Sequence, residues 1–187
     1  ERVRPWVRDS DREPGSLLRK HALQSDMAVH GASYRVLYRD IDSMGVLYYG
    51  RYLALFEMGR VEWMRSEGCR YRDLEREHGI LLPVTEAHCR YRSSIAYDDF
   101  ALVRTEVVSW SGTRVRFGHR IFVPDEDKCS DLNLLNEMAL HDSAGRLCAE
   151  GEVELGCVRR EDHRPTRLPE PLRGLLGSVA KHAYRKR

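Results

Sequence analysis

The chain has 187 residues, 42% hydrophobic and 32% charged, which is typical of one globular domain with a substantial core. Its net charge of +2 is too small to indicate nucleic-acid binding, so no nucleic-acid partner is expected. No apolar stretch approaches the roughly 18 residues of a membrane-spanning helix, so no membrane span is expected. The five cysteines are odd in number and form no Cys-x-x-Cys pair. They indicate neither a disulfide framework nor a zinc site, and they favour the cytoplasm.

The first half of the chain predicts one strand and one long helix. Residues 1–32 are polar and irregular and read as an extension, in which 16–29 could form a short helix. Residues 33–40 are rich in strand-forming side chains. Residues 51–67 form the one long amphipathic pattern, and Gly59 on its apolar face predicts close approach to a sheet.

The second half predicts mainly strands. A short helix is expected over 71–78, and another over 169–180. Strand patterns cover residues 80–93, 100–110, 113–123, 134–140 and 147–157. These elements predict an α+β fold in which a curved antiparallel sheet of about five strands wraps the long helix. We expect the domain to cover 33–160, followed by a tail with a short helix over 161–187.

Common catalytic motifs are absent from the sequence. It contains no Gly-x-Ser-x-Gly, no P-loop and no Gly-x-Gly-x-x-Gly. The eight histidines show no metal-ligand spacing, so neither a metal nor a cofactor is expected. His119 falls on the apolar face of a strand pattern, where a structural role is the usual one.

Two acids, Asp40 and Asp42, stand out because Gly45, an aromatic stretch and the long helix follow them. Aspartates also end strands and start turns for hydrogen-bonding reasons alone, and this structural interpretation stays open. The catalytic interpretation is that a carboxylate and a helix N-terminus face one small volume. That arrangement suits attack on a carbonyl whose oxygen gains negative charge.

The sequence around these acids resembles a known family. The block is Tyr38-Arg39-Asp40-Ile41-Asp42-Ser43-Met44-Gly45-Val46-Leu47-Tyr48-Tyr49, followed by Tyr52, Phe56-Glu57 and Arg60. It resembles the signature of the 4-hydroxybenzoyl-CoA thioesterase / YbgC-like family of hot-dog-fold acyl-CoA thioesterases. Tyr97-Asp98-Asp99, Gly112-Thr113-Arg114 and Leu168-Pro169 also match in order and spacing. The resemblance implies a hot-dog fold, hydrolysis of acyl-CoA to free acid and CoA, and a homodimer or homotetramer.

The resemblance also implies roles for individual residues. Asp42 would be the catalytic carboxylate, activating water or attacking the thioester carbon, and the backbone N–H of Tyr49 would hold the thioester oxygen. Asp40 would be strand-end structure. Gly45 would let the loop turn and let substrate approach closely. The other residues expected to border substrate are Val46, Tyr48, Tyr52 and Glu57, and those expected to meet CoA are Thr113, Arg114 and Arg116.

Two departures from the family pattern qualify this expectation. Many YbgC-type proteins have histidine where this chain has Tyr49, which predicts a shifted substrate preference. The benzoyl-CoA enzymes have a run of basic residues at the turn after Trp110, where this chain has Ser111-Gly112-Thr113-Arg114, which leaves Arg114 and Arg116 to meet the CoA phosphates. In addition, the stretch 125–140 has no family counterpart and is expected to be an insertion. Two other functions remain open: release of an acyl or polyketide chain from a carrier protein, and non-catalytic binding of acyl-CoA.

Overall fold

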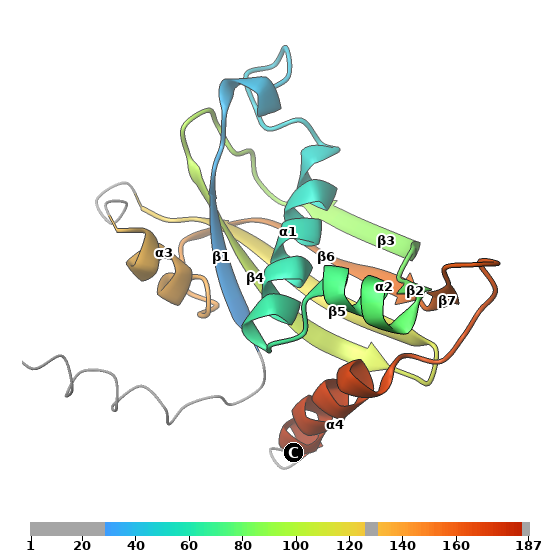
Figure 1. The fold of residues 1–187 in the computed structure, drawn as a ribbon. Helices are drawn as coiled ribbons and strands as arrows, with labels where there is room; N and C mark the ends of the chain where they lie inside the picture. The colour runs from blue at the N-terminus through green and yellow to red at the C-terminus, as the bar shows by residue number, and fades with distance from the viewer. Residues whose placement is uncertain (1–28, 126–130, 185–187) are drawn as a thin grey trace, which may run out of the picture.

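A computed structural model of the protein describes residues 29–125 and 131–184, without the side chains of 179–184 (Figure 1). Its main sheet has five antiparallel strands in the order β1-β4-β5-β6-β3. These strands are β1 (His30–Arg35), β3 (Val84–Tyr91), β4 (Phe100–Trp110), β5 (Arg114–Val123) and β6 (Arg146–Gly156). The sheet wraps the long helix α1 (Arg51–Ser66), which confirms the predicted α+β class.

Shorter elements complete the fold around this sheet. They are the 3₁₀ turn η1 (Tyr38–Asp40), the helices α2 (Tyr71–His78), α3 (Leu132–Met138) and α4 (Glu170–Tyr184), and a two-stranded pair of β2 (Ile80–Leu81) with β7 (Val158–Arg159). Within the described residues, no helix combines the length and the apolar character needed to cross a bilayer.

Helix α1 lies directly on the sheet because its apolar face is buried. The buried residues of that face are Tyr52, Leu55, Phe56, Gly59, Trp63 and Met64. A Cβ atom added to Gly59 would lie 2.3 Å from Thr105 Oγ1 and 2.9 Å from Val103 Cγ1, both on β4. The predicted close approach of helix and sheet at this glycine is therefore confirmed.

The strand predicted over residues 134–140 is wrong, because this stretch contains the helix α3. Asp131 caps the helix by accepting a hydrogen bond from the Asn133 N–H at 2.8 Å. Leu135 and Ala139, four positions apart, are buried in a second cluster with Leu102 and Phe122 of the sheet. A short apolar run does not distinguish strand from helix, and here the helical spacing matches the surface it covers.

Two of the predicted strands, over 33–40 and 80–93, have different boundaries in the structure. The first strand begins at His30 and ends at Arg35, and η1 follows it. The predicted strand over 80–93 is divided at Leu82-Pro83 into β2 and β3, since proline cannot donate to a strand ladder. The helix predicted over 16–29 lies outside the described residues, apart from Val29.

The C-terminal helix α4 is part of the packed domain. Leu172 and Leu176 on α4, with Leu168 just before it, are buried and join the main core beside α1 and the sheet. The segment that follows residue 160 therefore contributes three leucines to the core.

Candidate active site

The segment between β1 and α1 folds back on itself at the N-terminal end of α1, at the top of Figure 1. The Asp42 N–H donates to the Val46 carbonyl at 2.9 Å, and the Tyr48 N–H donates to the Asp40 carbonyl at 2.9 Å. These bonds place residues 46–49 beside residues 39–42. Gly45 turns the chain with φ of +76°, in the left-handed region that favours glycine. The local pairing thus brings the acids beside the start of the helix.

Asp40 is a buried structural acid, with only 1% of its surface exposed. Its carboxylate accepts hydrogen bonds from Tyr34 Oη at 2.7 Å, the Leu37 N–H at 3.0 Å and Arg51 Nε at 2.8 Å. Burial works to raise the pKa of Asp40, but the hydrogen bonds from Tyr34, Leu37 and Arg51 outweigh it and lower the pKa. This carboxylate is fully engaged in holding the loop.

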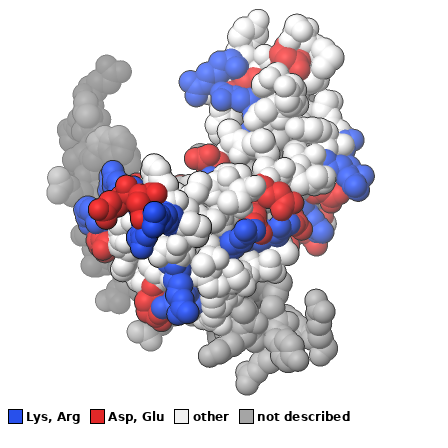
Figure 2. Space-filling view, turned by 90° about the vertical axis from the view of Figure 1, so that its right-hand side faces the viewer, with Lys and Arg blue, Asp and Glu red and all other residues white. Residues whose placement is uncertain are grey.

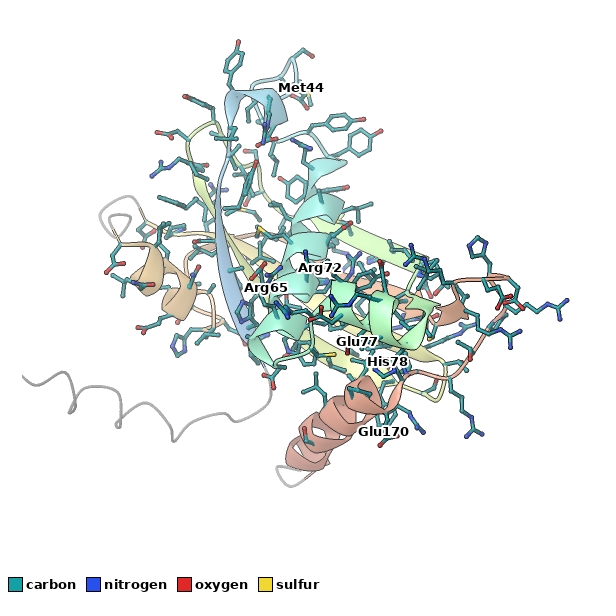
Figure 3. All side chains as sticks on the ribbon, in the orientation of Figure 1. Met44, Arg65, Arg72, Glu77, His78 and Glu170 are labelled. Carbon is teal, nitrogen blue, oxygen red and sulfur yellow. The ribbon has the colours of Figure 1, made fainter. Side chains whose placement is uncertain are left out.

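Asp42 is half-buried and has a freer carboxylate. One oxygen, Oδ1, accepts a hydrogen bond from the Met44 N–H at 2.8 Å. The other oxygen accepts none from the described residues. Met44 is 78% exposed and lies at the tip of this turn, far from the core (Figure 3). Asp42 therefore combines a fixed position with an oxygen available to water or substrate.

The backbone N–H of Tyr49 is also available. The Arg51 N–H donates to the Tyr48 carbonyl at 2.8 Å, which fixes the peptide group between Tyr48 and Tyr49. That peptide is trans, so its N–H points opposite to its carbonyl and away from the first turn of α1. Within the described residues this N–H donates no hydrogen bond. It is a free donor beside a helix N-terminus, where negative charge is favoured.

The other residues expected near substrate occupy different environments. Tyr48 is 43% exposed, and its ring lies against that of Tyr49 with centroids 4.4 Å apart. Val46 forms an isolated bridge with Ala96. Tyr52 instead belongs to the core, and its burial raises the pKa of its hydroxyl to about 12.

Glu57 lies one to two turns further along α1 and is mostly exposed. Its carboxylate forms an i,i+3 ion pair with Arg60 at 3.6 Å, in which Arg60 is the more buried partner. An exposed pair of this kind contributes little to stability, so the Glu57 side chain stays available to a neighbouring molecule.

The residues expected to meet CoA lie at the other end of the sheet. Thr113 and Arg114 follow the β4–β5 turn, where the Gly112 carbonyl accepts from the Leu168 N–H near α4 (Figure 1). β4 spans the distance between this turn and the Asp42 loop over eleven residues, roughly 35 Å of extended chain. A single chain does not bring these two groups together.

The arginines at this turn are paired with acids of the sheet. Arg114 is 61% exposed and contacts Glu154 at 2.8 Å. Arg116 contacts Glu154, Glu152 and Glu86, and these hydrogen bonds raise its pKa. Basic and acidic side chains also intermingle on the face drawn in Figure 2. Arg114 is the freer of the two cations.

The structure adds two residues to the site that sequence reasoning missed. Arg51 holds the Asp40 carboxylate, and Tyr91 of β3 donates its hydroxyl to the Tyr49 carbonyl at 3.1 Å. Arg51 could have been predicted to bind an acid of the preceding loop, because it stands at the start of the predicted helix. No feature of the sequence indicates the contact between Tyr91 and Tyr49, because the two residues are 42 positions apart. In the described part of the chain, no group of three or more ligating side chains could hold a metal ion.

A long helix wrapped by a five-stranded antiparallel sheet, with this loop at the helix N-terminus, defines the hot-dog class of proteins. The sequence model of the Thioesterase-like superfamily matches residues 36–176, and the chain belongs to that superfamily.

Individual relatives agree with this assignment. The acyl-CoA thioester hydrolase YbgC of Escherichia coli O6:H1 is 28% identical over 138 residues, which cover 74% of this chain and 88% of YbgC. YneP of Bacillus subtilis is 26% identical over 126 residues, covering 67% of this chain and 83% of YneP. The solved structure of a DHNA-CoA thioesterase from Staphylococcus aureus superposes with a TM-score of 0.71 at 26% identity, covering 85% of this chain and 95% of that one.

Proposed function

We propose that this chain is an acyl-CoA thioesterase that hydrolyses its substrate to the free acid and CoA. One observation carries the proposal: a single loop places two groups beside the N-terminus of α1, the Asp42 carboxylate and the Tyr49 N–H. Among the described residues, one oxygen of that carboxylate accepts no hydrogen bond and that N–H donates none. Membership of the Thioesterase-like superfamily and the naming of YbgC support the reaction class.

The proposed chemistry needs few groups. Asp42 activates water or attacks the thioester carbon, and the carbonyl oxygen gains negative charge as the new bond forms. The Tyr49 N–H and the helix dipole stabilise that charge. CoA then leaves as a thiolate, which is stable enough near neutral pH that strong acid assistance is not essential. Attack by water gives the free acid at once, whereas attack by Asp42 gives a mixed anhydride that water then hydrolyses to the free acid and the restored carboxylate.

We propose a homodimer or a higher homo-oligomer as the active form. Strand β3 is an edge of the sheet, and most of its side chains are exposed. The opposite edge, β1, is covered by α3. The two are so close that a Cβ on Gly31 would lie 2.2 Å from the Asn136 carbonyl oxygen. An unprotected edge favours pairing with another strand, so β3 is the edge available to a second copy.

The second copy would also account for the distant CoA residues. Thr113, Arg114 and Arg116 are too far from Asp42 in one chain to bind the same molecule at that loop. We propose that one copy supplies Asp42 and Tyr49 while another supplies the basic turn. The proposed location is the cytoplasm, in keeping with the four described cysteines, Cys69, Cys89, Cys148 and Cys157, which are all free thiols.

The decisive test is a panel of short, medium, long and aromatic acyl-CoA substrates assayed with the wild type and Asp42→Asn. We expect wild-type hydrolysis and a loss of about a hundredfold in Asp42→Asn, because a neutral amide neither activates water nor attacks the thioester. Glu161→Gln, at an exposed turn, is the matched control and should stay within twofold of wild type. Full activity in Asp42→Asn would refute the assigned role.

The same panel separates the other functions. A wild-type protein that releases acyl groups from a phosphopantetheinylated carrier protein but not from CoA would favour chain release. Saturable acyl-CoA binding without turnover on any substrate would favour a non-catalytic binding protein.

A further inference from the structure

Tyr91 connects the edge of the sheet to the start of α1. Its hydroxyl donates a hydrogen bond to the Tyr49 carbonyl at 3.1 Å. Its ring packs edge-on against Tyr52, with centroids 5.0 Å apart and planes at 78°. Because Tyr52 is only 3% exposed, the core holds the Tyr91 ring in place. The Tyr91 hydroxyl therefore reaches the Tyr49 carbonyl from a ring that is packed against the core.

The Tyr49 backbone is held on both sides. The peptide group before its Cα atom is fixed by the hydrogen bond from the Arg51 N–H to the Tyr48 carbonyl. The peptide group after it is fixed by Tyr91. Two fixed peptide planes determine φ and ψ of the residue between them, and with them the direction of its N–H. Neither bond uses the N–H itself, which donates to no other group in the described part of the chain and can bind a ligand.

The chemistry of the tyrosine suits a donor role. The carbonyl of Tyr49 can only accept, so the hydroxyl of Tyr91 must keep its proton. Partial burial of Tyr91 raises the pKa of that hydroxyl above its usual value, so it remains protonated throughout the neutral range.

We propose that Tyr91 is a positioning residue for thioester hydrolysis, which orients the Tyr49 N–H toward the oxygen that becomes negatively charged. This inference rests on the proposed thioesterase function. A donor that is held in place before the reaction stabilises developing charge without reorganising, so loosening it affects the transition state more than substrate binding.

Tyr91→Phe tests the proposal because it removes the hydroxyl and keeps the ring against Tyr52. One neutral hydrogen bond of this kind corresponds to a factor of about ten at most. We expect kcat to fall about five- to tenfold, KM to stay within twofold and the melting temperature to fall by less than about 5 °C. The loss should be equal for aliphatic and aromatic acyl-CoA, since every thioester oxygen would use the same N–H.

The control is Tyr97→Phe. Tyr97 is 57% exposed, and within the described residues its hydroxyl makes no hydrogen bond, so kcat should be unchanged. Unchanged kcat in Tyr91→Phe would overturn the proposal. So would a rise in KM alone, or a loss confined to one acyl class, since either would indicate substrate contact.

A second measurement does not depend on activity. The NMR order parameter of the Tyr49 N–H should be near 0.85 in the wild type and fall toward 0.6 in Tyr91→Phe, which are about the values of rigid and flexible backbone. An unchanged order parameter would contradict the positioning role. A wild type inactive on every thioester would refute the proposed function instead, and the order parameters would still report whether Tyr91 holds the peptide.

Discussion

Arg51 Nε donates a hydrogen bond to the Asp40 carboxylate at 2.8 Å, joining the first residue of α1 to the start of the loop that precedes it. Tyr34 and the Leu37 N–H bind the same carboxylate from the end of β1. One buried acid thus connects strand, loop and helix. Asp42 takes no part in this anchoring, and among the described residues only the Met44 N–H binds its carboxylate.

We predict that Asp40→Asn destabilises the fold. The neutral amide cannot replace charge-assisted bonds from both Arg51 and Tyr34, and one such bond contributes about 2 kcal/mol. Urea denaturation should show a loss of about that size. Asp42→Asn is the control and should unfold near the wild-type midpoint, because its carboxylate accepts only the Met44 N–H among the described residues. Equal losses in both variants would argue against distinct roles.

The Asp40 anchor should also weaken in acid. Its pKa is lowered in the folded state, so its contribution is complete above the unfolded pKa of about 3.9. The contribution is lost as pH falls through the lower, folded pKa. Over this acid range, wild-type stability should converge toward that of Asp40→Asn, as measured by urea denaturation at successive pH values.

His119 should produce a second pH dependence at higher pH. This histidine is 3% exposed, and burial, assisted by repulsion from Arg60, lowers its pKa to about 3. Between pH 3 and about 6.5 the unfolded chain binds a proton there and the folded chain does not. Stability should therefore fall as pH decreases through this range, with a slope of up to about 1.4 kcal/mol per pH unit.

The variant His119→Gln is the control for this pH dependence of the unfolding free energy. In the wild type, Thr105 Oγ1 lies 3.0 Å from His119 Nδ1. The glutamine amide can still form a hydrogen bond with Thr105, but it does not titrate. The unfolding free energy of this variant should depend less steeply on pH between 3 and 6.5. Identical slopes for the two proteins would contradict the assignment.

We predict that Gly59→Ala lowers stability although alanine favours helices. The new methyl would lie 2.3 Å from Thr105 Oγ1, and the overlap should cost about 1–3 kcal/mol, more than the roughly 1 kcal/mol gained in helix propensity. Gly174 of α4 is the matched helical glycine, since nothing lies within 4 Å of its added Cβ. Thermal unfolding should show a lower midpoint for Gly59→Ala and an equal or higher one for Gly174→Ala.

Arg114→Ala tests the proposed CoA contact. Losing one exposed cation opposite a phosphate should raise KM for acyl-CoA about three- to tenfold and leave kcat unchanged. A thioester of the same acyl group on N-acetylcysteamine lacks the nucleotide phosphates, so its KM should not change. If KM rose equally for both substrates, Arg114 would not be a phosphate contact.

Local patterns determined the elements that carry a strong signal. The helix over residues 51–66 was predictable because its apolar side chains recur at helical spacing, and the close approach at Gly59 followed from a glycine on that face. The short run over 134–140 was misassigned, because the surface it covers, not its own sequence, selects the helix. The loop residues Asp40, Asp42 and Gly45 were identifiable from their order along the chain.

Only the tertiary structure decided what those residues do. Asp40 and Asp42 are the same residue type two positions apart, and burial beside Arg51 and Tyr34 makes Asp40 structural, whereas among the described residues one oxygen of Asp42 accepts no hydrogen bond. Tyr91 meets Tyr49 because the sheet curves around α1, a contact between positions 42 residues apart that no local pattern encodes. The sequence determined which side chains the loop carries. The tertiary structure determined which of them are held by neighbouring residues and which can still bind water or substrate.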